Sequence, residues 1–347
     1  MNRSLLCILV FSLFGLSCSD QQGKHDSGGL FAIVQNGKWG FIDKTGAVVI
    51  TPQFDGANDF SDGFSAVRVG GTYGFIDHTG SLIINPQFER AGRFADGLAA
   101  IRVGGKFGFI DETGAFVINP QFDEAGEFVD GLARIRTGTK WGFVDKEGKM
   151  AINPIFDGAH DYAQGFAAVR LSPHWGFIDH DGKMMINPQF SVAMDFCEGL
   201  AAVKLDKTWG YVDLDGKVAI RPQFAAAGSF AGKMAPVRVG TKWGFIDQSG
   251  KLVVSPQFDA AEDFSGDLAA IRLANKWGYV DRGGKIVIQT QFNEANPFSD
   301  GIALIRISSR TGYIDVGGKY VWGPLERGTS VREGEDEAKS RDKDWWE

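Results

Sequence analysis

The sequence has no basic stripe, no run of apolar residues long enough to span a membrane comfortably, and only three cysteines. Its 36 basic and 43 acidic residues give a net charge of −7 that is spread along the chain, which argues against nucleic acid as a partner. Its cysteines are Cys7, Cys18 and Cys197. Because the first two lie in the N-terminal segment, we predict no internal disulfide in the folded region. Units elsewhere in the chain hold Ser or Ala at the position of Cys197, which predicts a small packed side chain there.

Helical spacing is also missing. No stretch of 12 residues places apolar side chains at the intervals that an amphipathic helix needs. Glycine is abundant instead, at 47 residues, and phenylalanine, at 28, outnumbers every other aromatic. This composition is typical of β-proteins with many turns.

The N-terminal segment predicts export. A short basic stretch, "MNR", precedes the apolar run "SLLCILVFSLFGL", as in a secretory signal. The next residues, "GLSC", resemble the lipobox of bacterial lipoproteins, in which the cysteine carries the lipid. Gly15 and Leu16 depart from the usual lipobox residues, so plain secretory cleavage is the alternative. We predict a signal peptide over 1–17, lipid attachment at Cys18, a flexible tether over 18–28 and a membrane-anchored place in the bacterial cell envelope, on the periplasmic or the surface side.

The rest of the chain is a tandem repeat of 34 residues over 29–325. The same pattern occurs nine times without insertion or deletion, and an aromatic–Gly pair opens every copy except the last, which has Thr–Gly. A charged tail over 326–347, low in aliphatic residues, is predicted to be disordered. The glycines of the pair are Gly40, Gly74, Gly108, Gly142, Gly176, Gly210, Gly244, Gly278 and Gly312.

One unit reads as three strands, as in "LAAIRV", "FGFID" and "AFVI". The segment "NPQFDEAGEF" is predicted to be a connecting loop, with its proline ending the third strand. The Asp of "FID" and a Gly three residues later recur in every unit, and they predict a turn in which Asp accepts backbone N–H bonds. For the glycine after the aromatic we expect that it makes room for the neighbouring unit, with a β-bulge as the alternative.

The two aromatic rings of each unit cannot be buried by a three-stranded sheet alone, so the next unit must cover them. We therefore predict an all-β fold of three-stranded hairpin or meander units in an open β-solenoid or superhelix, with a closed β-propeller as the alternative. The ninth unit has Thr311 in place of the aromatic and lacks "PQF". Such a degenerate last copy favours a cap on an open stack.

The pattern "KWGFIDKTG…VI.PQFD.A..F..G.A.VR" resembles the WG (or KWG) repeat found in many bacterial proteins, frequently exported ones. The resemblance runs from Gly29 to about Pro324. It implies a β-rich repeat fold without a general enzymatic activity.

A basic residue recurs near the end of each first strand after the opening unit. Two interpretations are open: each residue pairs with the strand Asp or lies across the aromatic ring, or the row forms a groove for an anionic polymer. The structural one is favoured, because each unit also supplies a carboxylate. The candidate binding row consists of Arg68, Arg102, Arg136, Arg170, Lys204, Arg238, Arg272 and Arg306.

No arrangement of residues predicts an active site, a metal site or a cofactor. The five histidines do not form a row that recurs through the repeat, and carboxylates in the third unit that could hold calcium are missing from the sixth. We predict a non-enzymatic, membrane-tethered repeat protein that binds or scaffolds another macromolecule. A protein partner is favoured, with a cell-wall glycan such as peptidoglycan as the alternative, bound through exposed aromatics.

Overall fold

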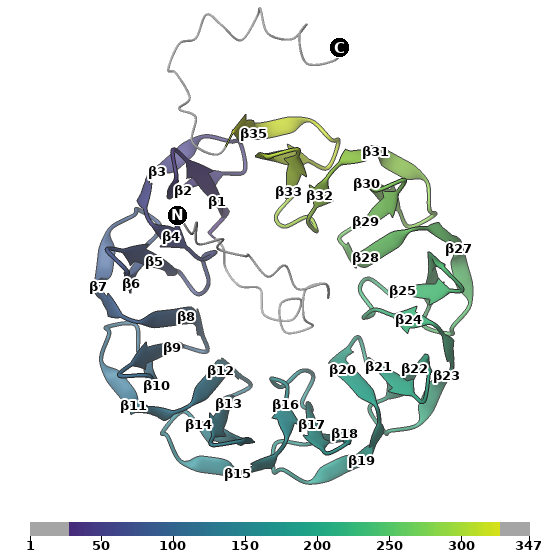
Figure 1. The fold of residues 1–347 in the computed structure, drawn as a ribbon, viewed down its shortest axis with the longest axis horizontal. Coiled ribbons are helices and arrows are strands. Elements are labelled where there is room, and N and C mark those ends of the chain that lie inside the picture. The colour runs from purple at the N-terminus through teal and green to yellow at the C-terminus, as the bar shows by residue number, and fades with distance from the viewer. Residues whose placement is uncertain (1–27, 327–347) are drawn as a thin grey trace, which may run out of the picture.

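The computed structural model describes residues 28–326, and these form nine small antiparallel sheets that close into a ring (Figure 1). Each sheet is a blade, and the fold is a nine-bladed β-propeller. All regular elements within these residues are strands, so the predicted all-β class is confirmed. The predicted signal peptide, tether and tail lie outside the described residues, apart from Gly28 and Glu326.

Every blade after the first has four strands in sequence order, running from the middle of the ring to its outside. The inner strands are β4 (Gly56–Ala57), β8 (Arg90–Ala95), β12 (Glu124–Val129), β16 (Gly158–Ala159), β20 (Val192–Cys197), β24 (Ala226–Ala227), β28 (Ala260–Ser265) and β32 (Glu294–Ala295). The second strands are β1 (Leu30–Gln35), β5 (Ser65–Val69), β9 (Leu98–Val103), β13 (Leu132–Thr137), β17 (Ala167–Leu171), β21 (Leu200–Leu205), β25 (Met234–Val239), β29 (Leu268–Leu273) and β33 (Ile302–Ile307).

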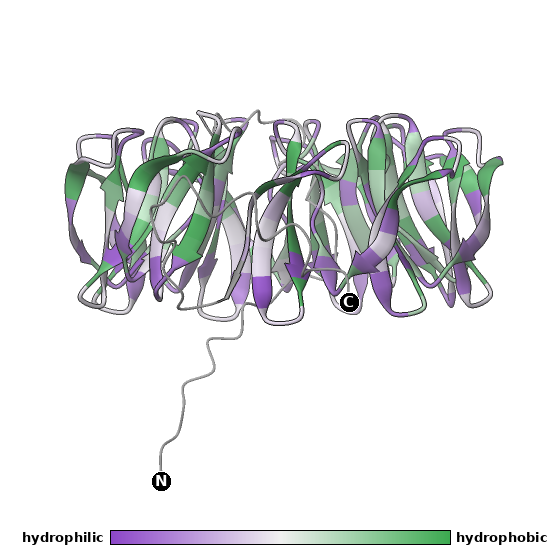
Figure 2. Ribbon diagram, turned by 90° about the horizontal axis from the view of Figure 1, so that it is seen from above, coloured by the Kyte–Doolittle hydropathy of each residue, from purple (hydrophilic) through white to green (hydrophobic). Residues whose placement is uncertain are grey.

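The third strands carry the aromatic–Gly pair. They are β2 (Lys38–Asp43), β6 (Thr72–Ile76), β10 (Lys106–Ile110), β14 (Lys140–Asp145), β18 (His174–Ile178), β22 (Thr208–Asp213), β26 (Lys242–Asp247), β30 (Lys276–Asp281) and β34 (Arg310–Asp315). The outer strands are β3 (Val48–Phe54), β7 (Leu82–Phe88), β11 (Phe116–Phe122), β15 (Met150–Phe156), β19 (Met184–Phe190), β23 (Val218–Phe224), β27 (Leu252–Phe258), β31 (Ile286–Phe292) and β35 (Tyr320–Glu326). Seen from the side, these strands run between two rims of loops (Figure 2).

The predicted open solenoid is wrong, and the error lies in the connecting segment. Residues interpreted as a loop form the end of one outer strand and the inner strand of the next blade, which supplies the fourth strand of a propeller blade. The proline does not end the strand: β3 runs through Pro52 to Phe54. A proline is tolerated there because an outer strand is an edge strand, whose free side needs no N–H donor.

The glycine of the aromatic–Gly pair makes room for the outer strand of its own blade. The outer strand bulges opposite it, since Trp39 faces Phe54 whereas Phe41 faces Ile50. A Cβ on Gly40 would lie 2.4 Å from the Ile50 carbonyl oxygen. The equivalent contact measures 2.4–2.5 Å at seven further glycines of the pair and 2.8 Å at Gly312. The bulge alternative is therefore correct, and the expectation of a neighbouring unit at this point is wrong.

The Asp–Gly turn matches its prediction. Asp43 Oδ1 accepts hydrogen bonds from the backbone N–H groups of Thr45 at 2.8 Å and Ala47 at 3.1 Å. Gly46 adopts a positive φ of 88°, which glycine reaches without strain. The Asp therefore has a structural role in the turn.

Adjacent blades bury the second aromatic ring of each unit between them, as predicted, whereas the ring before the Gly stays partly exposed. Phe41 is fully buried and meets the ring of Phe60, which precedes the second strand of the next blade, with centroids 4.9 Å apart. Ile76 of that blade joins the same cluster. The arrangement repeats from blade to blade, so each blade is covered on both faces and the core is a ring of such clusters.

The first and last blades meet through a modified version of this interface. Tyr313 donates a hydrogen bond to the Ala32 carbonyl at 2.8 Å, and its ring lies 5.7 Å from that of Phe31. Trp322 and Ile42 complete the cluster. Every later unit has Ser or Ala at the position of Phe31. The departures in the terminal units therefore serve ring closure, where the sequence suggested a cap.

Cys197 is fully buried against Ala163, as a small packed side chain should be. It is also disulfide-bonded, and because it is the only cysteine among residues 28–326, no disulfide joins two residues of that part of the chain.

Candidate functional site

The structure places the predicted basic row one residue per blade in every blade after the first, near the end of the second strand. Five of its arginines lie over the aromatic ring of the facing strand, at 5.6–6.0 Å from the ring centroid. Arg68 and Arg170 each donate to a backbone carbonyl at 3.1 Å. Arg136 and Arg306 form ion pairs with Glu124 and Glu294. The stacking matches the structural interpretation of the row, whereas the strand Asp is engaged in its turn and is not the partner.

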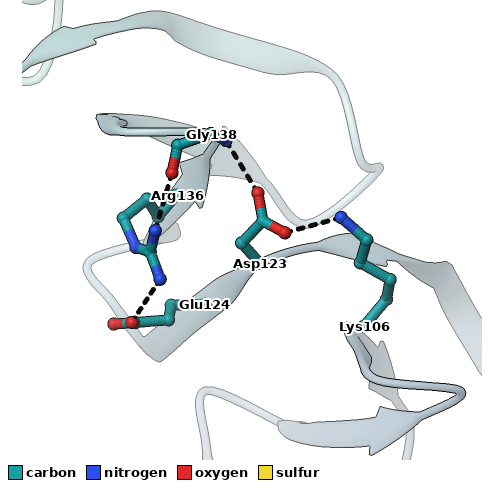
Figure 3. Close-up of polar contacts among 5 residues, drawn as sticks. All are labelled: Lys106, Asp123, Glu124, Arg136 and Gly138. Carbon is teal, nitrogen blue, oxygen red and sulfur yellow. Dashed lines mark hydrogen bonds and ion pairs between the residues drawn. The ribbon is translucent and has the colours of Figure 1, made fainter.

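A second polar contact links consecutive blades at the same rim. Lys106 Nζ lies 2.6 Å from Asp123 Oδ1, and Asp123 Oδ2 accepts the Gly138 amide of the next blade at 2.7 Å (Figure 3). These hydrogen bonds, with that from Lys106 the larger influence, hold the pKa of Asp123 below its ordinary value. Arg136 donates to the Gly138 carbonyl and pairs with Glu124 beside it.

This Lys–Asp–amide contact recurs around the ring and assigns a structural role to the lysine before the Trp. The same two contacts are made by Lys38, Asp55 and Gly70, by Lys140, Asp157 and Ser172, and by Lys242, Asp259 and Ala274. The contact therefore belongs to the repeat, and functional residues have to be sought where the repeat is broken.

The inner layer of blades 3–6 holds such a break. Three ion pairs follow one another there, each between adjacent blades. They join Arg93 Nε to Glu127 at 2.6 Å, Arg134 Nε to Asp161 at 2.9 Å and His160 Nδ1 to Asp195 at 2.8 Å. We call these six residues the inner-strand cluster. Between 20% and 36% of each side chain is exposed, so the cluster reaches solvent on the inner side of the ring.

Arg134 makes the clearest departure from the repeat in this cluster. The equivalent position is Ala in six other units, Pro in one and Leu in one. Its guanidinium lies 5.3 Å from the Trp141 ring centroid and donates to the Ala159 carbonyl of the next blade at 3.0 Å. Gly126 leaves the space, because a Cβ there would lie 2.4 Å from Asp161 Oδ1.

The pKa of Asp161 lies above the ordinary value of an aspartate. Burial raises its pKa to about 6, opposed by the Arg134 guanidinium and reinforced by the carboxylates of Glu127 and Asp195. At neutral pH the carboxyl is therefore ionised and paired.

The junction of blades 7 and 8 repeats this slot without the arginine. Asp263 is equivalent to Asp161, Gly228 to Gly126 and Pro236 to Arg134. Asp263 is 8% exposed, and burial raises its pKa to about 8, reinforced by the neighbouring carboxyl of Glu262. Burial raises the pKa of Glu262 to about 7.

The chemistry of the inner-strand cluster is that of ion pairing and hydrogen bonding. Among residues 28–326, no group of three or more His, Cys, Asp or Glu side chains is placed to hold a metal ion. Nor does a helix of that part of the chain have the length and apolar character to cross a membrane. The sequence analysis missed the cluster. An arginine where most units have alanine is the signal that could have found it.

Comparison with known proteins agrees with the geometry. The family model described as "WG containing repeat" matches residues 39–73, 73–107, 107–141, 141–172, 175–209, 209–243, 243–277 and 277–309. The protein therefore belongs to the WG-repeat family, and its fold is a nine-bladed propeller of those repeats.

One solved structure has a similar fold. It is described as the crystal structure of the eukaryotic initiation factor and aligns with a TM-score of 0.60 at 14% identity, covering 84% of this chain and 94% of that one. Another, dihydro-heme d1 dehydrogenase NirN in complex with DHE, aligns with a TM-score of 0.45 at 12% identity, covering 85% of this chain and 77% of the other. No curated protein matches the chain.

Proposed function

We propose that the protein is an exported, lipid-anchored, non-enzymatic propeller that binds a protein partner on the inner side of its ring. The inner-strand cluster carries this proposal. Its charges come from four consecutive blades and remain partly exposed, and Arg93, Arg134 and His160 are matched at their positions in no other unit. Charges of both signs in a fixed order determine which partner surface fits and in which orientation.

The exposure of the aromatics favours a protein over a wall glycan. A glycan-binding row needs exposed rings in successive units, but the Trp rings are only partly exposed and most have an arginine over them. Among residues 28–326 the exposed large aromatics are Phe116 and Tyr320, which are not in neighbouring blades. The glycan alternative predicts that a soluble Ser19–Glu347 chain co-sediments with peptidoglycan at moderate salt, and the present proposal predicts that it stays in the supernatant.

The membrane anchor rests on Cys18. A lipid on this residue and a tether up to residue 28 would hold the ring beside a membrane. Metabolic labelling with a fatty-acid analogue should mark the wild-type chain and leave the Cys18→Ser variant unmarked. If neither chain is labelled, Cys18 carries no lipid and the protein is secreted without an anchor.

Site-specific photocrosslinking tests the binding surface in the cells that make the protein. A crosslinking amino acid replaces Val192 of the inner strand β20, which is 37% exposed. The matched control replaces Val218 of the outer strand β23 in the same blade, which is 51% exposed. We expect one discrete protein adduct from position 192 and none from 218.

A charge swap connects the adduct to the cluster. The double variant Arg93→Glu with Glu127→Arg keeps the ion pair between blades and reverses the charge that each blade presents. We expect the adduct at position 192 to disappear while the ring stays folded. An adduct that persists at its wild-type level would contradict recognition by the inner-strand cluster.

A further inference from the structure

We propose that a cavity between blades 2 and 3 binds the carboxylate-bearing ring of an acidic sugar. The cavity has a volume of about 350 Å³, and its lining includes Asn58, Arg68 and Tyr73 of blade 2 with Glu89 and Arg90 at the start of blade 3. It is separate from the inner-strand cluster, and the proposal stands independently of the protein partner.

Two residues leave the cavity open: Tyr73 is smaller than the Trp of most units, and Asn58 is shorter than the residues at its position in blades 5 and 6, although three other units have Gly there. Six of the nine units have Trp at the position of Tyr73. In blade 5 the Trp175 ring lies 4.8 Å from the ring of His160, which is the equivalent of Asn58. In blade 6 Trp209 packs against the same cluster as Met194, at that same position. With Tyr73 and Asn58 in these places, the space that an indole and a longer side chain would fill is left open.

The charge of the cavity favours an anion. Arg90 faces Arg102 directly across strands β8 and β9, and like charges in this position repel each other. In blades 4 and 9 the equivalent partner is Glu124 or Glu294, and each forms an ion pair with its arginine. Glu89 lies 3.7 Å from Arg102 and, in the described part of the chain, forms an ion pair with that arginine alone. Within residues 28–326 no ion pair or hydrogen bond engages the guanidinium of Arg90.

Arg68 adds a second donor group. Its Nη2 donates to the Asp55 carbonyl, while its Nε is buried without a hydrogen-bond partner among the described residues. Five of its equivalents lie over an aromatic ring, whereas Arg68 lines the cavity. Two guanidinium groups beside one cavity match the planar, bidentate geometry of a carboxylate.

The remaining lining suits a hydroxylated ring. Tyr73 offers an aromatic face and a phenolic hydroxyl, and the Asn58 amide both donates and accepts hydrogen bonds. A pocket of this size, at the small end of the range for ligand sites, holds a single sugar unit. The combined lining therefore points to an acidic sugar rather than to a neutral one or a bare anion.

Binding of glucuronate to the purified ring, measured by calorimetry, tests the proposal, with glucose and acetate as comparison ligands. We expect glucuronate to bind and the other two to bind at least about tenfold more weakly, equivalent to about 1.4 kcal/mol. Acetate binding as tightly as glucuronate would show that the sugar ring is not recognised. Absence of glucuronate binding would overturn the site.

Three variants locate the site. Tyr73→Trp restores the residue that most units carry, so it should fold, fill the cavity and abolish binding. Arg90→Ala should also abolish binding and, because it removes the Arg90–Arg102 repulsion, leave the ring at least as stable. Arg221→Ala changes an exposed arginine on the outer strand β23 and should bind like the wild type. Unchanged affinity in Tyr73→Trp or Arg90→Ala contradicts the proposal, and neither result alters what is expected of crosslinking at position 192.

Discussion

The junctions between blades 4 and 5 and between blades 7 and 8 bury a carboxyl in the same slot of the repeat with different companions. At the first, Asp161 lies beside Arg134 and has a pKa of about 6. At the second, Asp263 lies beside Pro236 and has a pKa of about 8. In both, a glycine opposite leaves the room for the carboxyl, since a Cβ would lie 2.4 Å from Asp161 Oδ1 or 2.6 Å from Asp263 Oδ1.

The comparison shows that one backbone arrangement gives two junctions with different charge. Near pH 7 the blade 4–5 side carries charged groups that are partly exposed, whereas the carboxyl on the blade 7–8 side is protonated and neutral. The repeat fixes the slot, and the neighbouring residues decide its charge: Arg134 lowers the pKa of Asp161, whereas Glu262 raises that of Asp263. A partner that recognises charged groups would therefore bind at blades 3–6.

The largest effect is expected from Asp263→Asn. The pKa of Asp263 is raised from 3.8 to about 8 in the folded ring, so between these values the unfolded chain releases a proton that the folded chain keeps. Stability then falls as pH rises, and the part of this loss that Asp263 contributes should vanish in the variant, whereas the part from Glu262 remains. We expect a gain of about 3 kcal/mol in unfolding free energy on going from pH 5 to pH 8, relative to the wild type, as each pKa unit is worth about 1.4 kcal/mol.

Denaturant unfolding at several pH values measures this gain. Asp161→Asn is the matched control at the other junction. Parallel pH profiles for the Asp263→Asn variant and the wild type would contradict the claim that Asp263 is protonated in the folded ring.

Arg134→Met should convert the first junction into the second. Without the guanidinium, the pKa of Asp161 rises further above its present value of about 6. The loss of charge-assisted contacts costs about 2 kcal/mol at pH 8, and less at pH 5, where the carboxyl can be protonated. Unfolding at the two pH values checks the difference, and an equal loss at both would mean that only packing was disturbed.

Gly126→Ala tests the shared glycine of the slot. Its Cβ would meet Asp161 Oδ1 and displace the ion pair, and the expected loss is about 1.5 kcal/mol, in the range of overpacking effects. Gly92→Ala is the control at the same repeat position, because its nearest contact is the Ala100 carbonyl oxygen at 3.4 Å. Thermal unfolding should separate the two variants, and equal stability would show that the slot is not tight.

The smallest change is expected from Pro236→Arg, which supplies Asp263 with the partner that Asp161 has. A cation beside the carboxyl lowers its pKa, so the pH-dependent loss of stability should shrink by about 1 kcal/mol. The pH profile of unfolding measures it. An unchanged profile would indicate that the arginine turns away to solvent.

The elements of the repeat could be predicted because they depend on local rules. Alternating apolar residues predict the second and third strands, and Asp43 with Gly46 predicts the turn through its own geometry. The position of Trp39 before Gly40 predicts a close backbone approach but not its source. Only the bulge opposite, between Ile50 and Phe54, identifies that source.

Ring closure and the inner-strand cluster could not be predicted in the same way. An inner strand as short as Gly56–Ala57 has too few residues to show a period of two, and Pro52 looked like the end of the strand. Arg134 and Asp161 are in contact because blades 4 and 5 are neighbours in the ring. Their spacing in the sequence matches no local rule.

The most direct test of the account is a carboxyl NMR titration of Asp161 and Asp263 in chains labelled at aspartate. Single Asn substitutions at the two positions assign the signals. We expect Asp263 to titrate near pH 8 and Asp161 near pH 6. Titration of both at ordinary acidic pH would contradict the claim that the residues beside this slot set its charge.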